Sequence, residues 1–172
     1  VIDADGHVIE PEEMFAEMPA EFFPRRPVRV QLPTDTLRED FNGCWIIEGK
    51  TCPAIGGKGR TTFYLAGDER SRKMDVSIPS QTLADIDARV ADLDRFNIDV
   101  QVVFPTMFLA ATAQDVGLES ALFQAYNTYV GRACEKSKGR VRWVAMIPFR
   151  DPERAVLEMR RSKSKTRSGS II

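Results

Sequence analysis

The chain contains one histidine, His7, and it lies near the amino-terminal end among carboxylates, in the segment DADGHVIEP (residues 3–11). Asp5 and His7 are separated by one residue, and alternate residues of an extended strand project to the same side. A carboxylate and a neutral imidazole are suitable ligands for zinc, manganese or iron. A D-x-H pair is by itself a common pattern, so two interpretations stay open. Either the pair belongs to a metal site, or His7 hydrogen-bonds Asp5 or Glu10 and orders a turn.

Signals for strands and helices alternate along the chain, and they decide where this pair would lie. The first nine residues predict a short strand that ends near Asp5 to His7, since Asp and Gly disfavour strands. After residue 81 we expect helix, strand, helix, strand and helix, over residues 82–96, 98–105, 117–138, 141–149 and 151–161. This alternation predicts an α/β fold of βα units on a parallel sheet, with right-handed crossovers. Sites in such folds gather at the carboxyl ends of strands, where Asp5 and His7 stand.

Two of the predicted helices begin at residues suited to capping. Thr82 and Asp85 resemble a capping box at the start of the first helix, with Asp in place of the usual Glu or Gln. Asp151 followed by Pro152 predicts an N-cap and a first helical position for the last helix. The first signal predicts that the helix before the second strand begins at residue 82, and the second predicts that the last helix begins at residue 151.

Residues 10–81 lack this regularity and predict a long irregular insertion after the first strand. Five prolines between residues 11 and 33 exclude a long helix, although EPEEMFAEM (10–18) allows one or two helical turns. The segment CWIIEGKTCPAI (44–55) predicts a hairpin that turns at Gly49–Lys50. The loop IGGKGR (55–60) lacks the spacing of a phosphate-binding P-loop, so we predict no nucleotide site there.

The composition excludes several classes of protein. The 24 basic and 25 acidic residues give a net charge of −1, which argues against a nucleic-acid-binding surface. No apolar run approaches the roughly 20 residues that span a bilayer, and the acidic opening is not a signal peptide. The three cysteines have no CxxC spacing, so we expect reduced thiols in a cytoplasmic protein. A disulfide between Cys44 and Cys52 across the hairpin is the less favoured alternative.

The last segment, RSKSKTRSGSII (161–172), departs from the alternating pattern. It is basic, rich in serine and low in apolar residues, whereas the pattern would require a fourth strand here. Its composition predicts a disordered polar tail. A basic arm for nucleic acid is the less favoured alternative, because the segment has no aromatic residue to stack on bases.

Three segments together resemble one known family. DADGHVIEP (3–11), DARVADLDRFNIDVQVVFPT (87–106) and YNTYVGRACEKSKGRVRWVAMIPFRDPERAVLEM (126–159) are similar, in this order, to the amidohydrolase-related family of metal-dependent TIM-barrel enzymes. The nearest branch includes the aminocarboxymuconate semialdehyde decarboxylase-like proteins. The resemblance covers the chain to about residue 160. It implies that residues 1–160 form part of a (β/α)8 TIM-like barrel: three βα units, with the insertion 10–81 after the first strand.

The resemblance also implies roles for individual residues. Asp5 and His7 match two metal ligands of the family's first strand, and the metal would be zinc, manganese or iron. Segments that face the substrate in the family match three residues here: Glu10 in the loop after the first strand, and Phe104 and Thr106 after the second strand. For Phe104 and Thr106, the alternative roles are strand capping and packing. The substrate would be a small carboxylate or amide. A divalent ion would support hydrolysis of an amide or ester-like bond, or non-oxidative decarboxylation.

The chain departs from the family pattern in one respect that bears on activity. The remaining ligands of the family are histidines of later strands, and its catalytic aspartate comes from the last strand. A complete barrel takes about 250 residues, and His7 is the only histidine here. We therefore predict an incomplete site, no catalytic residue, and no activity of the isolated chain as a hydrolase or decarboxylase. The alternatives are a non-catalytic α/β interaction module, a half-barrel completed by another chain, or association of the open sheet into a homo-oligomer.

Overall fold

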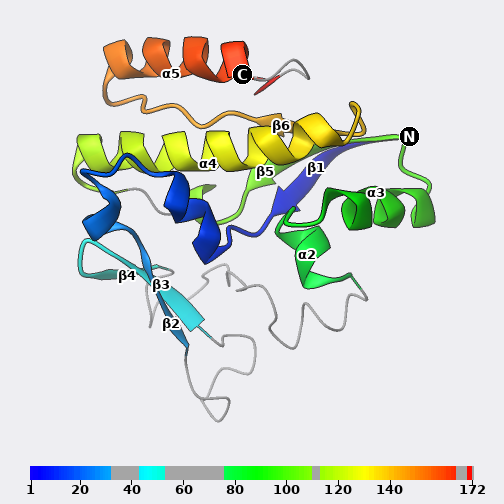
Figure 1. The fold of residues 1–172 in the computed structure, drawn as a ribbon, viewed down its shortest axis with the longest axis horizontal. Helices are drawn as coiled ribbons and strands as arrows, with labels where there is room; N and C mark the ends of the chain where they lie inside the picture. Colours follow the sequence, from blue (N-terminus) through cyan, green and yellow to red (C-terminus); the bar gives the residue numbers. More distant parts are fainter. Residues whose placement is uncertain (32–42, 53–75, 110–112, 166–169, 172) are drawn as a thin grey trace.

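A parallel sheet forms the centre of the molecule in the computed structural model, which describes residues 1–31, 43–52, 76–109, 113–165 and 170–171 (Figure 1). The order of its strands is β1 (Ile2–Val8), β5 (Val100–Pro105), β6 (Val141–Val144) and β7 (Ser170–Ile171). Helices α3 (Ile86–Arg95), α4 (Val116–Lys136) and α5 (Pro152–Lys165) lie in the three connections. The α/β class and the parallel sheet predicted from the sequence are confirmed; within the described residues, β7 does not pair with β1 to close a barrel.

The two faces of the sheet have different surroundings. Val103 and Trp143 pair in register and are fully buried in the same core as the apolar side chains of α4. The strands follow one another in chain order, and right-handed crossovers then place every connecting helix on the same face. We call the other face the open face; it carries Ile2, Asp5, His7, Val100, Val102, Phe104, Arg142 and Val144. Its members are half-buried or exposed.

The helix before β5 begins later than the sequence predicted. Thr82 ends a separate short helix, α2 (Ile78–Gln81), and its hydroxyl donates to the carbonyl of Ile78 at 3.0 Å. The N-cap of α3 is Asp85, whose carboxylate accepts the backbone N–H groups of residues 87 and 88, both at 3.0 Å. Leu83, with φ of 59°, reverses the chain between the two helices. The predicted capping box at Thr82 is therefore wrong.

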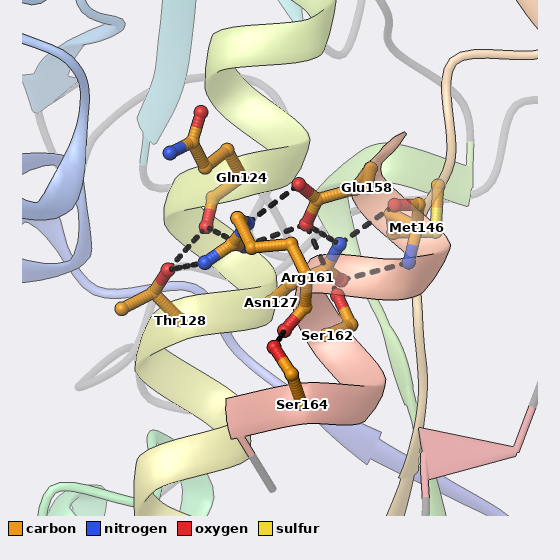
Figure 2. Close-up of polar contacts among 8 residues, drawn as sticks. All are labelled: Gln124, Asn127, Thr128, Met146, Glu158, Arg161, Ser162 and Ser164. Atoms are coloured by element: carbon orange, nitrogen blue, oxygen red, sulfur yellow. Dashed lines mark hydrogen bonds and ion pairs between the residues drawn. The ribbon is translucent and has the colours of Figure 1, made fainter. Parts of the chain in front are cut away.

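Helix α5 extends into the segment that was expected to be a disordered tail. It runs to Lys165, and β7 then pairs with β6, so the boundary at residue 161 and the missing fourth strand are corrected. The reason is a buried carboxylate, Glu158, which accepts hydrogen bonds from Arg161 Nη2 at 2.6 Å and Ser162 Oγ at 3.1 Å (Figure 2). These partners are polar, so the composition of the segment hides their role in the helix.

Figure 2 also shows how α4 holds the loop after β6. The Asn127 amide donates to the Met146 carbonyl at 2.7 Å and accepts from the Met146 N–H at 2.8 Å. The same amide nitrogen donates to Glu158 Oε1 at 2.7 Å. One buried side chain therefore fixes both the carboxyl-terminal exit of β6 and the position of α5.

The insertion contains a short helical segment and a second sheet. The helical turn predicted at EPEEMFAEM is confirmed as the 3-10 helix η1 (Glu12–Glu17), followed by η2 (Phe23–Arg25). The second sheet is antiparallel, with β2 (Val28–Gln31), β3 (Gly43–Ile47) and β4 (Lys50–Cys52). The hairpin is confirmed, but it turns at Glu48–Gly49, where both residues have positive φ. The IGGKGR loop lies outside the described residues.

The three cysteines are free and buried, which confirms that no disulfide forms among them. No helix in the described part of the chain combines the length and apolar character needed to cross a membrane.

Candidate functional site

Asp5, at the middle of β1, and His7, one residue before its end, lie close together. Asp5 Oδ1 is 3.9 Å from His7 Nε2, so the spacing of two residues does bring the two side chains to one side of the strand. The side chain of Asp5 is 95% exposed and that of His7 is 41% exposed. Both groups can therefore be reached from solvent, as ligands of an exchangeable ion must be.

A backbone carbonyl orients the imidazole ring. His7 Nδ1 lies 3.2 Å from the carbonyl oxygen of Pro105 at the end of β5. A carbonyl can only accept, so this hydrogen bond requires Nδ1 to carry a proton, and Nε2 is the ring nitrogen that faces Asp5. Metal-binding histidines are commonly oriented in this way, by a hydrogen bond from the second ring nitrogen.

A buried polar chain lies beneath β1. Gln101 of β5 accepts a hydrogen bond from Arg89 Nε at 2.8 Å and donates to Asp3 Oδ2 at 2.6 Å. The hydrogen bond from Gln101 is the main cause that lowers the pKa of Asp3. Arg89 Nη2 also donates to the carbonyl of His7 at 2.9 Å. The guanidinium of α3 therefore holds the backbone of the residue whose side chain is the candidate ligand.

Gly6 lets β1 pass close to this chain. The pairing of β1 with β5 shifts register between Asp3 and Gly6, so the strand bulges beside Asp5. A Cβ atom at Gly6 would lie 2.6–2.7 Å from side-chain atoms of Gln101, closer than real contacts allow. Gln101 is fixed by Arg89 and cannot move aside without losing a buried hydrogen bond.

We therefore expect Gly6→Ala to lower the free energy of unfolding by about 1–3 kcal/mol, the usual cost of forcing an extra carbon into a packed interior. Chemical denaturation measures the change. Gly139→Ala is not a suitable control, because the φ angle of Gly139 is 88° and alanine is strained there. Ala4→Gly changes an exposed position of the same strand and is expected to lower the free energy of unfolding by less than Gly6→Ala does. Equal stability of Gly6→Ala and the wild type would contradict the close approach.

Glu10 and Thr106 connect the loop after β1 to the turn after β5. Glu10 is 4% exposed, and its two carboxylate oxygens accept the N–H groups of Thr106 at 2.8 Å and Met107 at 2.9 Å. Burial raises the pKa of Glu10 to about 7. The Thr106 hydroxyl donates to the carbonyl of Val8 at 2.8 Å. Both side chains are occupied within the protein, and a direct contact of either with substrate stays a prediction.

Phe104 lies beside the candidate ligand on the open face. It pairs in register with His7, and the centroids of the two rings are 6.4 Å apart. The half-buried ring makes an apolar wall next to the imidazole. Its role as a substrate contact stays a prediction.

The sequence did not single out Arg89, Gln101 or Asn127, although it held a signal for one of them. Arg89 lies three residues after Ile86 and four before Leu93, on the buried face of α3. A charged residue at an apolar position of a helix indicates a buried partner. Its acceptors lie on β1 and β5, however, and helical periodicity alone does not show which strands those are.

Asp5 and His7 supply two donors and do not by themselves complete a metal site. Zinc sites in proteins are almost always four-coordinate, with three protein ligands even where one position is open. Within the described residues, no group of three or more His, Cys, Asp or Glu side chains is placed to hold a metal ion. Asp5 and His7 alone would fill at most two positions of such a site.

The chain matches no protein-family model and no curated protein sequence. Its fold is similar to the crystal structure of an amidohydrolase from Mycobacterium avium subsp. paratuberculosis K-10, with a TM-score of 0.64 and 18% sequence identity. The similarity covers 99% of this chain and 47% of the amidohydrolase chain. At this identity the similarity is one of fold, and this chain spans about half the length of that protein.

Proposed function

We propose that Asp5 and His7 are two ligands of a divalent metal ion in an amidohydrolase-like active site, to which this chain contributes the first strands. The observation that carries the proposal is the geometry of the pair: Oδ1 and Nε2 lie 3.9 Å apart on β1, and Nδ1 faces a carbonyl. The similarity in fold to an amidohydrolase supports it. An imidazole and a carboxylate are suitable ligands for zinc, and also for manganese and iron.

The residues of this chain would position the reactants. A bound divalent ion polarises a substrate oxygen or lowers the pKa of a water molecule. The Pro105 carbonyl holds the imidazole through Nδ1, and Arg89 holds the backbone of His7 from below. Phe104 provides an apolar surface beside the imidazole for the body of a small carboxylate or amide substrate. Hydrolysis and non-oxidative decarboxylation are both compatible with this arrangement, and the group that transfers the proton would come from outside this chain.

The single histidine makes metal binding directly observable. We expect added Mn²⁺ or Co²⁺ to broaden or shift the imidazole NMR signals of His7, which need no assignment because no other histidine is present. In Asp5→Asn, the metal concentration needed for the same change in the imidazole signals should rise at least about tenfold, as expected for the loss of a ligand or of its support. Asp87→Asn, at an exposed carboxylate of α3, is the matched control and should change nothing. Imidazole signals that ignore the metal, or that respond equally in Asp5→Asn, would contradict the proposal.

A further inference from the structure

We propose that Glu10 is a positioning residue for His7: its carboxyl group fixes and polarises the peptide unit between Pro105 and Thr106, whose carbonyl accepts the Nδ1–H of the imidazole. The coupling between the two side chains needs no metal, whereas its consequence for metal binding rests on the proposed function. Glu10 then has a role at the site that requires no contact with substrate.

One peptide unit joins the two side chains. The Pro105 carbonyl oxygen lies 3.2 Å from His7 Nδ1, and the N–H of Thr106, which belongs to the same peptide unit, donates to Glu10 Oε1 at 2.8 Å. A peptide unit is planar, and its N–H and C=O point in opposite directions in the trans form, which almost all bonds before a residue other than proline adopt. Glu10 and the imidazole therefore hold one rigid group from opposite sides.

This peptide unit is anchored at more than one point. The second carboxylate oxygen of Glu10 accepts the N–H of Met107 at 2.9 Å, so two adjacent peptide units are held by one side chain. The Thr106 hydroxyl donates to the carbonyl of Val8 at 2.8 Å and ties the turn to β1, the strand that carries His7. Because of these bonds, the Pro105 carbonyl cannot rotate away from Nδ1 without breaking buried contacts.

The carboxyl group also strengthens the carbonyl as an acceptor. Glu10 is 4% exposed, and hydrogen bonds in such surroundings polarise one another along a chain. An N–H that donates to a carboxylate makes a stronger bond than one that donates to a neutral oxygen, and it shifts electron density toward the carbonyl oxygen of its own peptide unit. A stronger acceptor favours the proton on Nδ1. In the neutral imidazole this leaves the lone pair on Nε2, the nitrogen that faces Asp5.

The cost of burying Glu10 supports a role at the site. Burial raises the pKa of Glu10 to about 7, which shows that the charged form is held in unfavourable surroundings. A neutral side chain could accept the N–H of the same turn without this cost. Buried groups with a perturbed pKa gather at functional sites, and this one lies one peptide unit behind the candidate ligand.

The ring nitrogens of His7 test the coupling without metal. Nitrogen-15 NMR distinguishes a protonated from an unprotonated ring nitrogen, and no other histidine is present. At pH 8, above the pKa of Glu10, we expect the Nδ1–H tautomer to dominate in the wild type. In Glu10→Gln the ratio of the Nδ1–H to the Nε2–H tautomer should fall about threefold to tenfold, the effect of weakening one ordinary hydrogen bond. A wild type in which the Nε2–H tautomer dominates would overturn the proposal, even if the variant fails to fold.

Glu158→Gln is the matched control. Glu158 is also a buried carboxylate, 7% exposed, and it accepts hydrogen bonds from Asn127 of α4 and Arg161 of α5. Its replacement removes a buried charge at another place and should leave the tautomer ratio of His7 unchanged. Equal tautomer ratios in the wild type and Glu10→Gln, or an equal fall in both glutamine variants, would overturn the positioning role.

Metal affinity separates this inference from the proposed function. The Mn²⁺ concentration that half-broadens the imidazole signals should rise about tenfold in Glu10→Gln, the lower end of the range for residues behind a metal-binding histidine. A tautomer ratio that falls in Glu10→Gln, in a protein whose wild type binds no metal, would support the positioning role and contradict the proposed function. A wild type that binds Mn²⁺, with the same tautomer ratio in both proteins, would contradict this inference and leave the proposed function standing.

Discussion

Replacing Arg89 with methionine is expected to lower the free energy of unfolding by about 2–4 kcal/mol, because each buried neutral acceptor that loses its donor costs about 1–3 kcal/mol. Arg89 is 8% exposed, and burial lowers the pKa of its guanidinium, so its hydrogen bonds must offset the cost of removing the charge from water. Methionine fills a similar volume but donates nothing. The carbonyl of His7 and the amide oxygen of Gln101 would both lose their donor.

Urea denaturation measures this loss, and Arg160→Met is the matched control. Arg160 is exposed on α5, and its replacement is expected to change the stability by less than about 0.5 kcal/mol. Arg89→Lys retains the charge with fewer donors and should fall between the wild type and Arg89→Met. Equal stability of the two methionine variants would show that the polar chain beneath β1 contributes nothing.

The features that could be predicted from the sequence follow from local periodicity. Alternation of apolar runs located β1, β5 and β6 and the helices between them, because each element buries one side against the same core. The spacing of Asp5 and His7 was enough to predict that their side chains approach each other, since strand geometry fixes it within three residues. Their roles as ligands stay a prediction, because a ligand is defined by its partners as well as its position.

The features that could not be predicted depend on contacts between distant residues. The hydrogen bond from Arg89 to His7 joins residues 82 positions apart, and that from Thr106 to Glu10 joins residues 96 apart. The break between α2 and α3 depends on the positive φ of Leu83, which an apolar pattern does not encode. The last turns of α5 depend on a buried carboxylate that accepts from two polar residues of the supposed tail.

The stability of the protein is expected to fall by about 3 kcal/mol as the pH rises from 4.5 to 7, because of Glu10. Burial raises its pKa from 4.5 to about 7, although four backbone N–H groups oppose the shift. Between these values the folded protein binds a proton that the unfolded chain has released, so unfolding becomes easier as the pH rises. Below pH 4.5 both states are protonated, and above pH 7 neither is, so the dependence is confined to this window.

Glu10→Gln isolates the contribution of this carboxyl. Glutamine does not titrate, and its amide can accept from only one of the two N–H groups of Thr106 and Met107 with its single oxygen. The variant should therefore be less stable than the wild type at pH 5, and the gap should narrow by about 3 kcal/mol by pH 8. The pKa values of Asp3 and Asp115 are lowered from their ordinary value, so those carboxyls titrate below this window. If the free energies of unfolding of the wild type and of Glu10→Gln change in parallel from pH 5 to 8, Glu10 is ionised over this whole range. Its two hydrogen bonds from the turn after β5 would then outweigh the cost of burying its charge.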